Sequence, residues 1–78
     1  MWVEIVTTSA FECPWCIKAK ALLDSYCVKY DEFDISTSES AKNTMRHYGL
    51  KTIPQIWIND QHIGGYNELV EYYKRTFT

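Results

Sequence analysis

The sequence has few of the residues that interrupt helices and strands or cross-link a small protein. Its 78 residues include three cysteines, three glycines and two prolines, which excludes flexible linkers and low-complexity segments. A disulfide scaffold is also excluded, because three is an odd number and Cys13 and Cys16 are too close in sequence to close a stabilising loop. Since 46% of the residues are hydrophobic and 15% are aromatic, we expect one domain, residues 1–78, with a core of large side chains.

Long apolar runs and a strong excess of one charge are also absent. Residues 1–7 have no basic start and no apolar stretch of signal-peptide length, and no window of the sequence approaches a membrane span. The net charge is -2, and the basic residues are scattered, so they form no footprint for nucleic acid or acidic lipid. We therefore expect a cytoplasmic protein without nucleic-acid or membrane partners, and we also expect a monomer, although nothing in the sequence determines the oligomeric state.

What the sequence does contain is an alternation of strand and helix patterns. The expected elements are strands over residues 2–7, 28–35, 55–58 and 61–63, and helices over residues 14–26, 39–48 and after Gly65. Asn59 and Asp60 are expected to turn a hairpin between the last two strands, and Gly49 to end the second helix. This order predicts an α/β fold, a four-stranded mixed sheet flanked by three helices, which is the minimal thioredoxin-like architecture.

The chemistry is concentrated in the C-P-W-C segment at residues 13–16, where the first helix is expected to begin. A thiol attacks as its thiolate, and a cysteine with the ordinary pKa near 8.5 is mostly protonated. Cys13 is expected at the N-cap, where free N–H groups and the helix dipole favour the thiolate and place its pKa at about 3.5 to 7.5. Cys16, one turn further, is expected to be enclosed and protonated. We therefore predict that Cys13 is the nucleophile and that Cys16 resolves the mixed disulfide.

Other side chains favour or oppose this chemistry. Glu12 raises the pKa of a neighbouring thiol, and Lys18 and Lys20 are expected to offset part of that effect. The alternative to redox chemistry is a structural zinc site, which needs a second pair of ligands. The remaining candidates, Cys27 and two separate histidines, are not spaced as a pair. The strand-helix-strand setting therefore favours a redox role without a metal.

Four more conspicuous residues are assigned structural roles. Cys27 lies between a helix and a strand, where a lone cysteine is usually a small packing residue. Trp2 and Trp57 fall in predicted strands and are expected in the core or on a face of the sheet. His62, in the last strand, is likewise expected to be structural.

Two further segments give the cysteine pair a specific setting. A T-I-P segment at residues 52–54 lies just before the third strand, and a G-G-Y-N-E segment at residues 64–68 lies at the start of the last helix. Together with the cysteine segment, and in this order, they resemble the motifs of a dithiol glutaredoxin over nearly the whole chain. The resemblance implies the thioredoxin-like fold, with glutathione as co-substrate and no resident metal.

The resemblance also implies how glutathione binds. The peptide bond before Pro54 is expected to be cis and to lie against the cysteines, so that the backbone of Ile53 pairs with the cysteinyl part of glutathione. N–H groups at the start of the last helix are expected to hold the γ-glutamyl carboxylate, and Lys51 the glycyl carboxylate. The implied glutathione-binding residues are Trp15, Lys51, Thr52, Ile53, Pro54, Gly65, Tyr66 and Asn67.

Four positions depart from the family pattern. Ala10 stands where many relatives have a lysine, three residues before the nucleophile, in a loop that is longer than is common. Trp15 stands where tyrosine is most frequent, Cys27 replaces a frequent glycine, and Asn67 replaces an acidic residue. We therefore expect glutathione binding to be retained but weaker or differently oriented.

The predicted function is that of a glutathione-dependent thiol-disulfide oxidoreductase. It would reduce protein disulfides through both cysteines and glutathione mixed disulfides through Cys13 alone. The expected partners are glutathione and disulfide-containing or glutathionylated proteins, among which ribonucleotide reductase is a frequent client of the family. Three alternatives stay open: a redoxin recycled by thioredoxin reductase, an iron-sulfur cluster carrier, and an adaptor without thiol chemistry. A proline after the nucleophile, here Pro14, is typical of members that hold no cluster.

Overall fold

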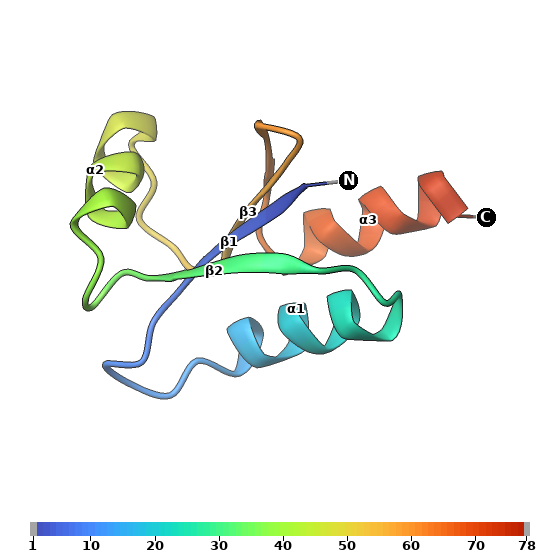
Figure 1. Ribbon diagram of the computed structural model, residues 1–78, viewed down its shortest axis with the longest axis horizontal. Coiled ribbons are helices and arrows are strands. Elements are labelled where there is room, and N and C mark those ends of the chain that lie inside the picture. Colours follow the sequence, from blue (N-terminus) through green and yellow to red (C-terminus); the bar gives the residue numbers. More distant parts are fainter. Residues whose placement is uncertain (1, 78) are drawn as a thin grey trace.

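The computed structural model describes residues 2–77 as an alternation of strands and helices (Figure 1). The elements are β1 Val3–Thr7, α1 Pro14–Ser25, β2 Tyr30–Asp34, α2 Glu39–Tyr48, β3 Gln55–Ile58, β4 Gln61–Gly64 and α3 Tyr66–Phe77. The predicted order is confirmed, but β2 begins later than expected. The reason is that the N–H of Val28 donates to the carbonyl of Leu23 at 3.0 Å, which ties residue 28 to the end of α1 instead of to the sheet.

The four strands form one mixed sheet in the order β2-β1-β3-β4. β1 pairs with β2 in parallel and with β3 antiparallel, and β3 and β4 form the predicted hairpin. β1 and β2 are parallel neighbours, so the chain between them must cross over, and α1 forms that crossover. The loop over residues 8–13 leaves the sheet at the end of β1, and α1 begins directly after this loop. The topology thus places the cysteine segment at one end of the sheet.

Both faces of the sheet are covered, as predicted, with α1 and α3 on one side and α2 on the other (Figure 1). Alternate residues of β1 serve the two faces: Val3 and Ile5 join the cluster with α1 and α3, and Val6 joins the cluster with α2. Leu23 of α1 and Leu69 of α3 are fully buried in the first cluster, and each such burial contributes about 1.5–3 kcal/mol. This packing fixes α1, and with it the cysteines, against the sheet.

The end of α1 shows that the packing role expected for Cys27 is wrong. Its side chain is exposed, and its backbone is left-handed, with a φ of 57°. The N–H of Cys27 donates to the carbonyl of Asp24, and the following N–H, of Val28, donates to that of Leu23, which is the Schellman pattern of helix ends. Glycine adopts this left-handed conformation most easily, which agrees with the glycine that the resemblance implies at this position.

The two strand tryptophans differ. Trp57 in β3 is buried, as predicted, whereas Trp2 is 56% exposed and precedes β1. The indole Nε1 of Trp2 donates to Asp31 at 3.1 Å, so its ring lies at the edge of the fold. The core or sheet-face position expected for Trp2 is therefore wrong, because the strand ladder starts one residue later.

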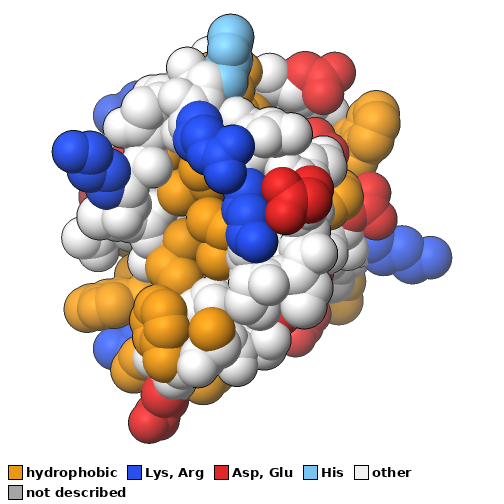
Figure 2. All heavy atoms as spheres, turned by 90° about the vertical axis from the view of Figure 1, so that its left-hand side faces the viewer, with side chains coloured by type: hydrophobic (Ala, Val, Ile, Leu, Met, Phe, Trp, Pro, Cys, Tyr) orange, Lys and Arg blue, Asp and Glu red, His pale blue; other side chains and the backbone are white. Residues whose placement is uncertain are grey.

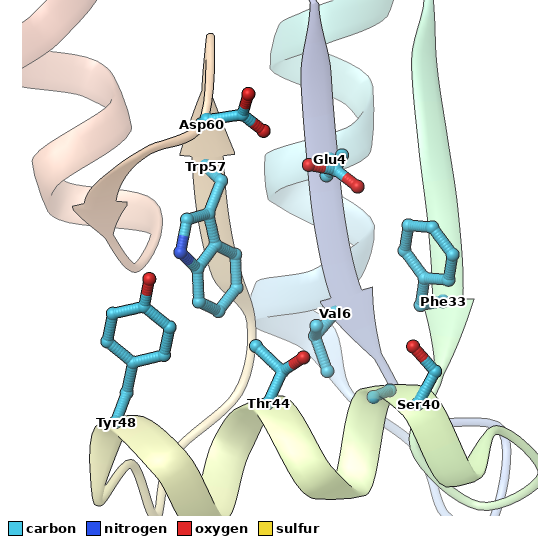
Figure 3. A pocket seen from close by; sticks show the side chains of 9 residues that line it. Glu4, Val6, Phe33, Ser40, Thr44, Tyr48, Trp57 and Asp60 are labelled. Atoms are coloured by element: carbon cyan, nitrogen blue, oxygen red, sulfur yellow. The ribbon is translucent and has the colours of Figure 1, made fainter.

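A cleft of about 300 Å³ lies between α2 and the sheet, on the face opposite α1. Figure 3 shows Tyr48 and Thr44 of α2 directed toward Trp57, with Glu4 and Asp60 nearby. Burial, with the carboxylates of Asp60 and Asp31, raises the pKa of Glu4. None of the predicted site residues lines this cleft. Within the described part of the chain, no helix combines the length and the apolar character that crossing a membrane requires.

Candidate active site

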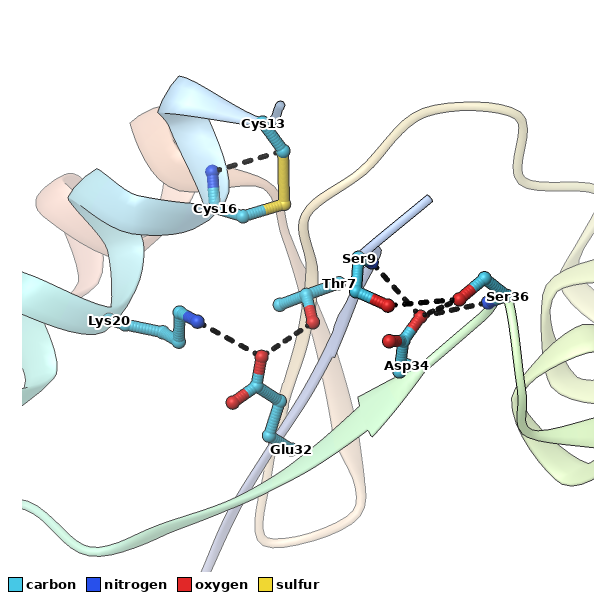
Figure 4. A network of polar contacts seen from close by, with 8 residues as sticks. All are labelled: Thr7, Ser9, Cys13, Cys16, Lys20, Glu32, Asp34 and Ser36. Atoms are coloured by element: carbon cyan, nitrogen blue, oxygen red, sulfur yellow. Dashed lines mark hydrogen bonds and ion pairs between the residues drawn. A yellow bond between two sulfur atoms is a disulfide. The ribbon is translucent and has the colours of Figure 1, made fainter. Parts of the chain in front are cut away.

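The cysteine pair occupies the start of α1, where the sequence places it. Cys13 is the N-cap, and its Sγ accepts a hydrogen bond from the backbone N–H of Cys16 at 3.2 Å. The two sulfur atoms are joined in a disulfide, with 5.3 Å between the two Cα atoms (Figure 4). Cys16 is 2% exposed, whereas Cys13 is half-buried. The expected N-cap and the enclosure of Cys16 are confirmed, so Cys13 presents the accessible sulfur.

A polar network joins the end of β1 to α1 and β2 (Figure 4). The hydroxyl of Thr7 donates to Glu32 Oε2 at 2.7 Å, and Lys20 Nζ donates to the same oxygen at 3.0 Å. The hydrogen bond from Thr7, helped by Lys20, lowers the pKa of Glu32 against the effect of burial. Lys20 is therefore paired across to β2, and its expected partial offset of the effect of Glu12 stays a prediction.

The loop before the cysteines is fastened to the end of β2. Asp34 Oδ1 accepts hydrogen bonds from the hydroxyl and N–H of Ser36, at 2.6 and 2.9 Å, and from the N–H of Ser9 at 3.1 Å (Figure 4). These bonds, those of Ser36 first, hold the pKa of Asp34 well below its ordinary value. The loop that carries Ala10 is thus tied to the end of β2 through Ser9.

Trp15 connects the cysteine segment to the start of α3. Its ring centroid lies 5.7 Å from that of Tyr66, with an interplanar angle of 42°. Lys18 Nζ lies 4.5 Å from the Trp15 ring centroid, a distance at which a cation is attracted to an indole face. Tyr66 also packs against the cluster beneath α1 and α3, so it both supports α3 and faces Trp15.

The T-I-P and G-G segments meet each other. The Ile53–Pro54 peptide is cis, as the resemblance implied, and Pro54 is buried. A Cβ added to Gly65 would lie 3.3 Å from the carbonyl oxygen of Pro54 and 3.4 Å from Glu68 Oε1. A side chain at residue 65 would therefore be tight against the Pro54 carbonyl, and glycine fits this close approach without a shift.

Glu68 closes the start of α3. The N–H of Gly65 donates to Glu68 Oε1 at 2.7 Å, which is the half of a capping box in which the third helical residue reaches back to the N-cap. This N–H is one of those expected to hold glutathione, and here it is engaged. The N–H groups of Tyr66 and Asn67 lie in the first turn, where no carbonyl four residues earlier is available.

The remaining predicted residues lie on the segment before β3. Thr52 is exposed and accepts hydrogen bonds from the side chain of Gln55, whereas Ile53 is partly buried against the cluster beneath α2. Lys51 is exposed, and no ion pair within residues 2–77 involves it. The structure thus links Trp15 with Tyr66 and Pro54 with Gly65, but it records no contact that ties Lys51 or Asn67 to them.

Sequence reasoning missed two residues in this region. Glu68 could have been found, because an acidic residue three positions after an N-cap is the capping-box signal. Gln55 gave a weaker signal, a polar residue at the start of a strand whose every residue is buried. Within the part of the chain that the structure describes, no three metal-ligating side chains gather at one point.

The end of the molecule that carries the loop before α1 has an apolar patch with basic side chains beside it (Figure 2). Three large apolar residues near the disulfide in sequence are exposed: Phe11 by 65%, Trp15 by 51% and Ile17 by 58%. The accessible Cys13 is therefore flanked in sequence, on both sides, by exposed apolar side chains, and exposed apolar side chains of this size suit contact with another protein.

Comparisons with known proteins agree with this geometry. The family model described as Glutaredoxin matches residues 3–63. Glutaredoxin 1 of Rickettsia conorii is 41% identical over 70 residues, covering 86% of this chain and 69% of the relative. Glutaredoxin 3 of Escherichia coli K12 is 43% identical over 68 residues, covering 86% of this chain and 80% of the relative.

A solved structure shows the same fold. Glutaredoxin 1 from Francisella tularensis, crystallised with cacodylate, superposes with a TM-score of 0.76 at 27% identity, covering 96% of this chain and 94% of that one. The mixed sheet, the three helices and the cysteine pair at the start of α1 are thus those of a thioredoxin-like redox protein. The chain belongs to the glutaredoxin family, and this membership supports a role as a thiol-disulfide oxidoreductase.

Proposed function

We propose that this protein uses glutathione to reduce protein disulfides and glutathione mixed disulfides. The observation that carries the proposal is the asymmetry of the cysteine pair, with an accessible Cys13 at the helix N-cap and a buried Cys16 one turn away. The contacts of Trp15 with Tyr66 and of Pro54 with Gly65 bring the segments implied in glutathione binding together beside it.

Reduction of a protein disulfide would proceed in two exchanges. The Cys13 thiolate attacks one substrate sulfur, forming a mixed disulfide while the other substrate sulfur leaves as a thiolate and takes up a proton. Cys16 then loses its proton and attacks the Cys13 sulfur, which releases the second substrate thiol. The product is the Cys13–Cys16 disulfide, the state that the structure contains.

Two molecules of glutathione would restore the dithiol. The first, as thiolate, attacks the Cys13 sulfur, so that a glutathione mixed disulfide forms and Cys16 is released as a thiol. The second attacks the glutathione sulfur of this mixed disulfide, giving glutathione disulfide and the Cys13 thiolate. With a glutathionylated client, the Cys13 thiolate attacks the glutathione sulfur and releases the client thiol, which gives the same mixed disulfide. Cys13 alone therefore suffices for that substrate.

The binding of glutathione would use backbone groups more than charges. The Tyr66 and Asn67 N–H groups are proposed for the γ-glutamyl carboxylate, the Ile53 backbone for the cysteinyl residue, and Lys51 for the glycyl carboxylate. Glu68 already engages the Gly65 N–H, and Ala10 supplies no cation. We therefore propose weaker binding than in relatives that have a lysine at the Ala10 position.

The test is a coupled assay with β-hydroxyethyl disulfide, glutathione, glutathione reductase and NADPH. The wild type is expected to turn over, and Cys13→Ser to lose at least about a thousandfold in rate, because a hydroxyl does not perform thiol exchange. Turnover with thioredoxin reductase but not with glutathione would instead establish the redoxin alternative. Activity that survives in Cys13→Ser would point to the adaptor role, and a coloured anaerobic preparation to a cluster carrier.

A further inference from the structure

We propose that Gln55, held in place by His62, is a positioning residue for the glutathione-binding edge at residues 52–54. The inference rests on the proposed function, since it concerns how that edge is kept in place. It assigns a role to two residues of the β3–β4 hairpin, Gln55 on β3 and His62 on β4.

The side chain of Gln55 anchors the segment before β3. Gln55 is 5% exposed, and its Nε2 donates to the carbonyl oxygen and to the hydroxyl of Thr52, each at 3.0 Å. Residues 51–54 belong to no helix or strand. Among the hydrogen bonds within residues 2–77, those recorded for this segment are the two from Gln55. Thr52 directly precedes Ile53, so the Gln55 amide fixes the residue next to the proposed pairing edge.

The hydrogen-bond partners also determine which way the Gln55 amide faces. The carbonyl of Thr52 can only accept, so the NH₂ group of Gln55 must face it. Gln55 Oε1 then faces His62 Nε2, at 2.8 Å. Because Oε1 can only accept, His62 Nε2 must carry a proton and donate. The chain of donors therefore runs from His62 to Gln55 to Thr52.

Aromatic contacts hold the imidazole of His62, the first donor in this series of hydrogen bonds. The His62 ring centroid lies 4.8 Å from that of Trp57 and 5.7 Å from that of Tyr48. Tyr48 and Trp57 come from α2 and β3, and their rings lie 5.6 Å apart (Figure 3). His62 is thus held on the face of the sheet that α2 covers. Its hydrogen bond fixes the Gln55 amide, which in turn bonds Thr52.

The decisive variant is Gln55→Glu, which keeps the shape of the side chain and its acceptor for His62 but removes both donors to Thr52. A donor lost from a buried site is costly. We expect the KM for a glutathionylated peptide to rise about tenfold while kcat changes less than about twofold, because the change affects binding and leaves the thiols alone. Gln61→Glu is the matched control, since Gln61 lies on the same hairpin but is exposed.

His62 supplies a graded test of the same chain. His62→Phe keeps an aromatic ring but removes the donor to Gln55, and we expect a KM increase of about threefold. His62→Gln restores a donor and is expected to return KM toward the wild-type value. A purely packing role predicts the opposite order, with Phe closer to the wild type than Gln.

The tautomer provides a readout that requires no variant. ¹⁵N chemical shifts of the wild-type imidazole near pH 8 are expected to show the Nε2–H form, and an Nδ1–H form would overturn the proposal even where a variant fails to fold. An unchanged KM in Gln55→Glu, in a wild type that turns over with glutathione, would overturn this inference alone. A wild type that does not turn over with glutathione would overturn both this inference and the proposed function.

Discussion

Two helices begin at the candidate site, and their first turns are closed in different ways. The N-cap of α1 is Cys13, whose sulfur accepts an N–H bond, and its first turn contains no acidic residue. The start of α3 has Gly65 before the first helical residue and Glu68 in the first turn, and the Glu68 carboxylate accepts the Gly65 N–H. The positive end of α1 is therefore left to the reactive sulfur, whereas that of α3 is partly neutralised by its own side chain.

This difference assigns separate tasks to the two helix starts. A thiolate at α1 gains from N–H groups that no carboxylate competes for. Under the proposed function, a ligand carboxylate at α3 would share the first turn with Glu68, and Gly65 lies close to the Pro54 carbonyl. One helix start would thus activate the Cys13 sulfur, and the other would offer a moderate site for a carboxylate of glutathione.

Cys16→Ser tests the task of α1 most strongly. We expect reduction of a protein disulfide to fall at least about a hundredfold, because no resolving thiol remains, while deglutathionylation stays within about threefold of the wild type. The two rates are measured with a disulfide-bonded protein and with a glutathionylated peptide. Loss of both activities in a folded variant would show that Cys13 does not act alone on either substrate.

Glu68→Gln removes the charge that distinguishes α3. We expect the KM for the glutathionylated peptide to fall about two- to fivefold, because the ligand carboxylate no longer meets a fixed negative charge. The free energy of unfolding is expected to fall by about 0.5 kcal/mol, since the carboxylate also stabilises the helix start. Urea denaturation and steady-state kinetics measure the two effects, and Glu71→Gln, further along α3, is the control. A higher KM would mean that Glu68 serves glutathione directly.

Ile17→Glu gives α1 the kind of charge that α3 has. Ile17 is 58% exposed and directly follows Cys16, so a carboxylate there is expected to raise the pKa of the Cys13 thiol. At a pH below that pKa, the rate of alkylation by iodoacetamide should fall about two- to threefold. Ile17→Gln separates the charge from the loss of the apolar side chain. Equal rates in both variants would show that the start of α1 does not control the thiolate.

Cys27→Gly examines the other end of α1 and is the smallest change. Glycine adopts the left-handed conformation found at residue 27 without strain, although it also gains freedom in the unfolded chain. We expect a net gain of about 0.5 kcal/mol in the free energy of unfolding, measured in urea, and unchanged thiol kinetics. A change in activity would assign Cys27 a redox role.

The sequence predicted the elements and the cysteine geometry because both depend on local patterns. Helical spacing after Pro14 and the N-cap position of Cys13 follow from residues close in the chain. The pairing of Lys20 depends on a contact between distant residues, because it could not be assigned to Glu32 without knowing that α1 crosses back over β2. The left-handed backbone of Cys27 belongs instead to the local motif that ends α1, which a lone cysteine does not signal as a glycine would.

Gln55 and Glu68 show the same difference between local patterns and contacts that depend on the fold. The capping distance of Glu68 is visible in the sequence, because the two groups are three residues apart. The hydrogen bond from His62 to Gln55 depends on the register of the β3–β4 hairpin, in which Trp57 lies opposite His62. A pattern of apolar residues predicts that hairpin but leaves its polar pairings undetermined.

The hydrogen bonds of Asp34 have a consequence for protein engineering. They hold Ser9 and Ser36 together at the point where the chain leaves the sheet, and the exposed Phe11 follows within the same loop. The attachment of the loop and its outward surface are thus made by different residues. Exchange of the side chains of residues 10–12 is therefore expected to leave in place both the bonds that anchor the loop and the N-cap bond of Cys13.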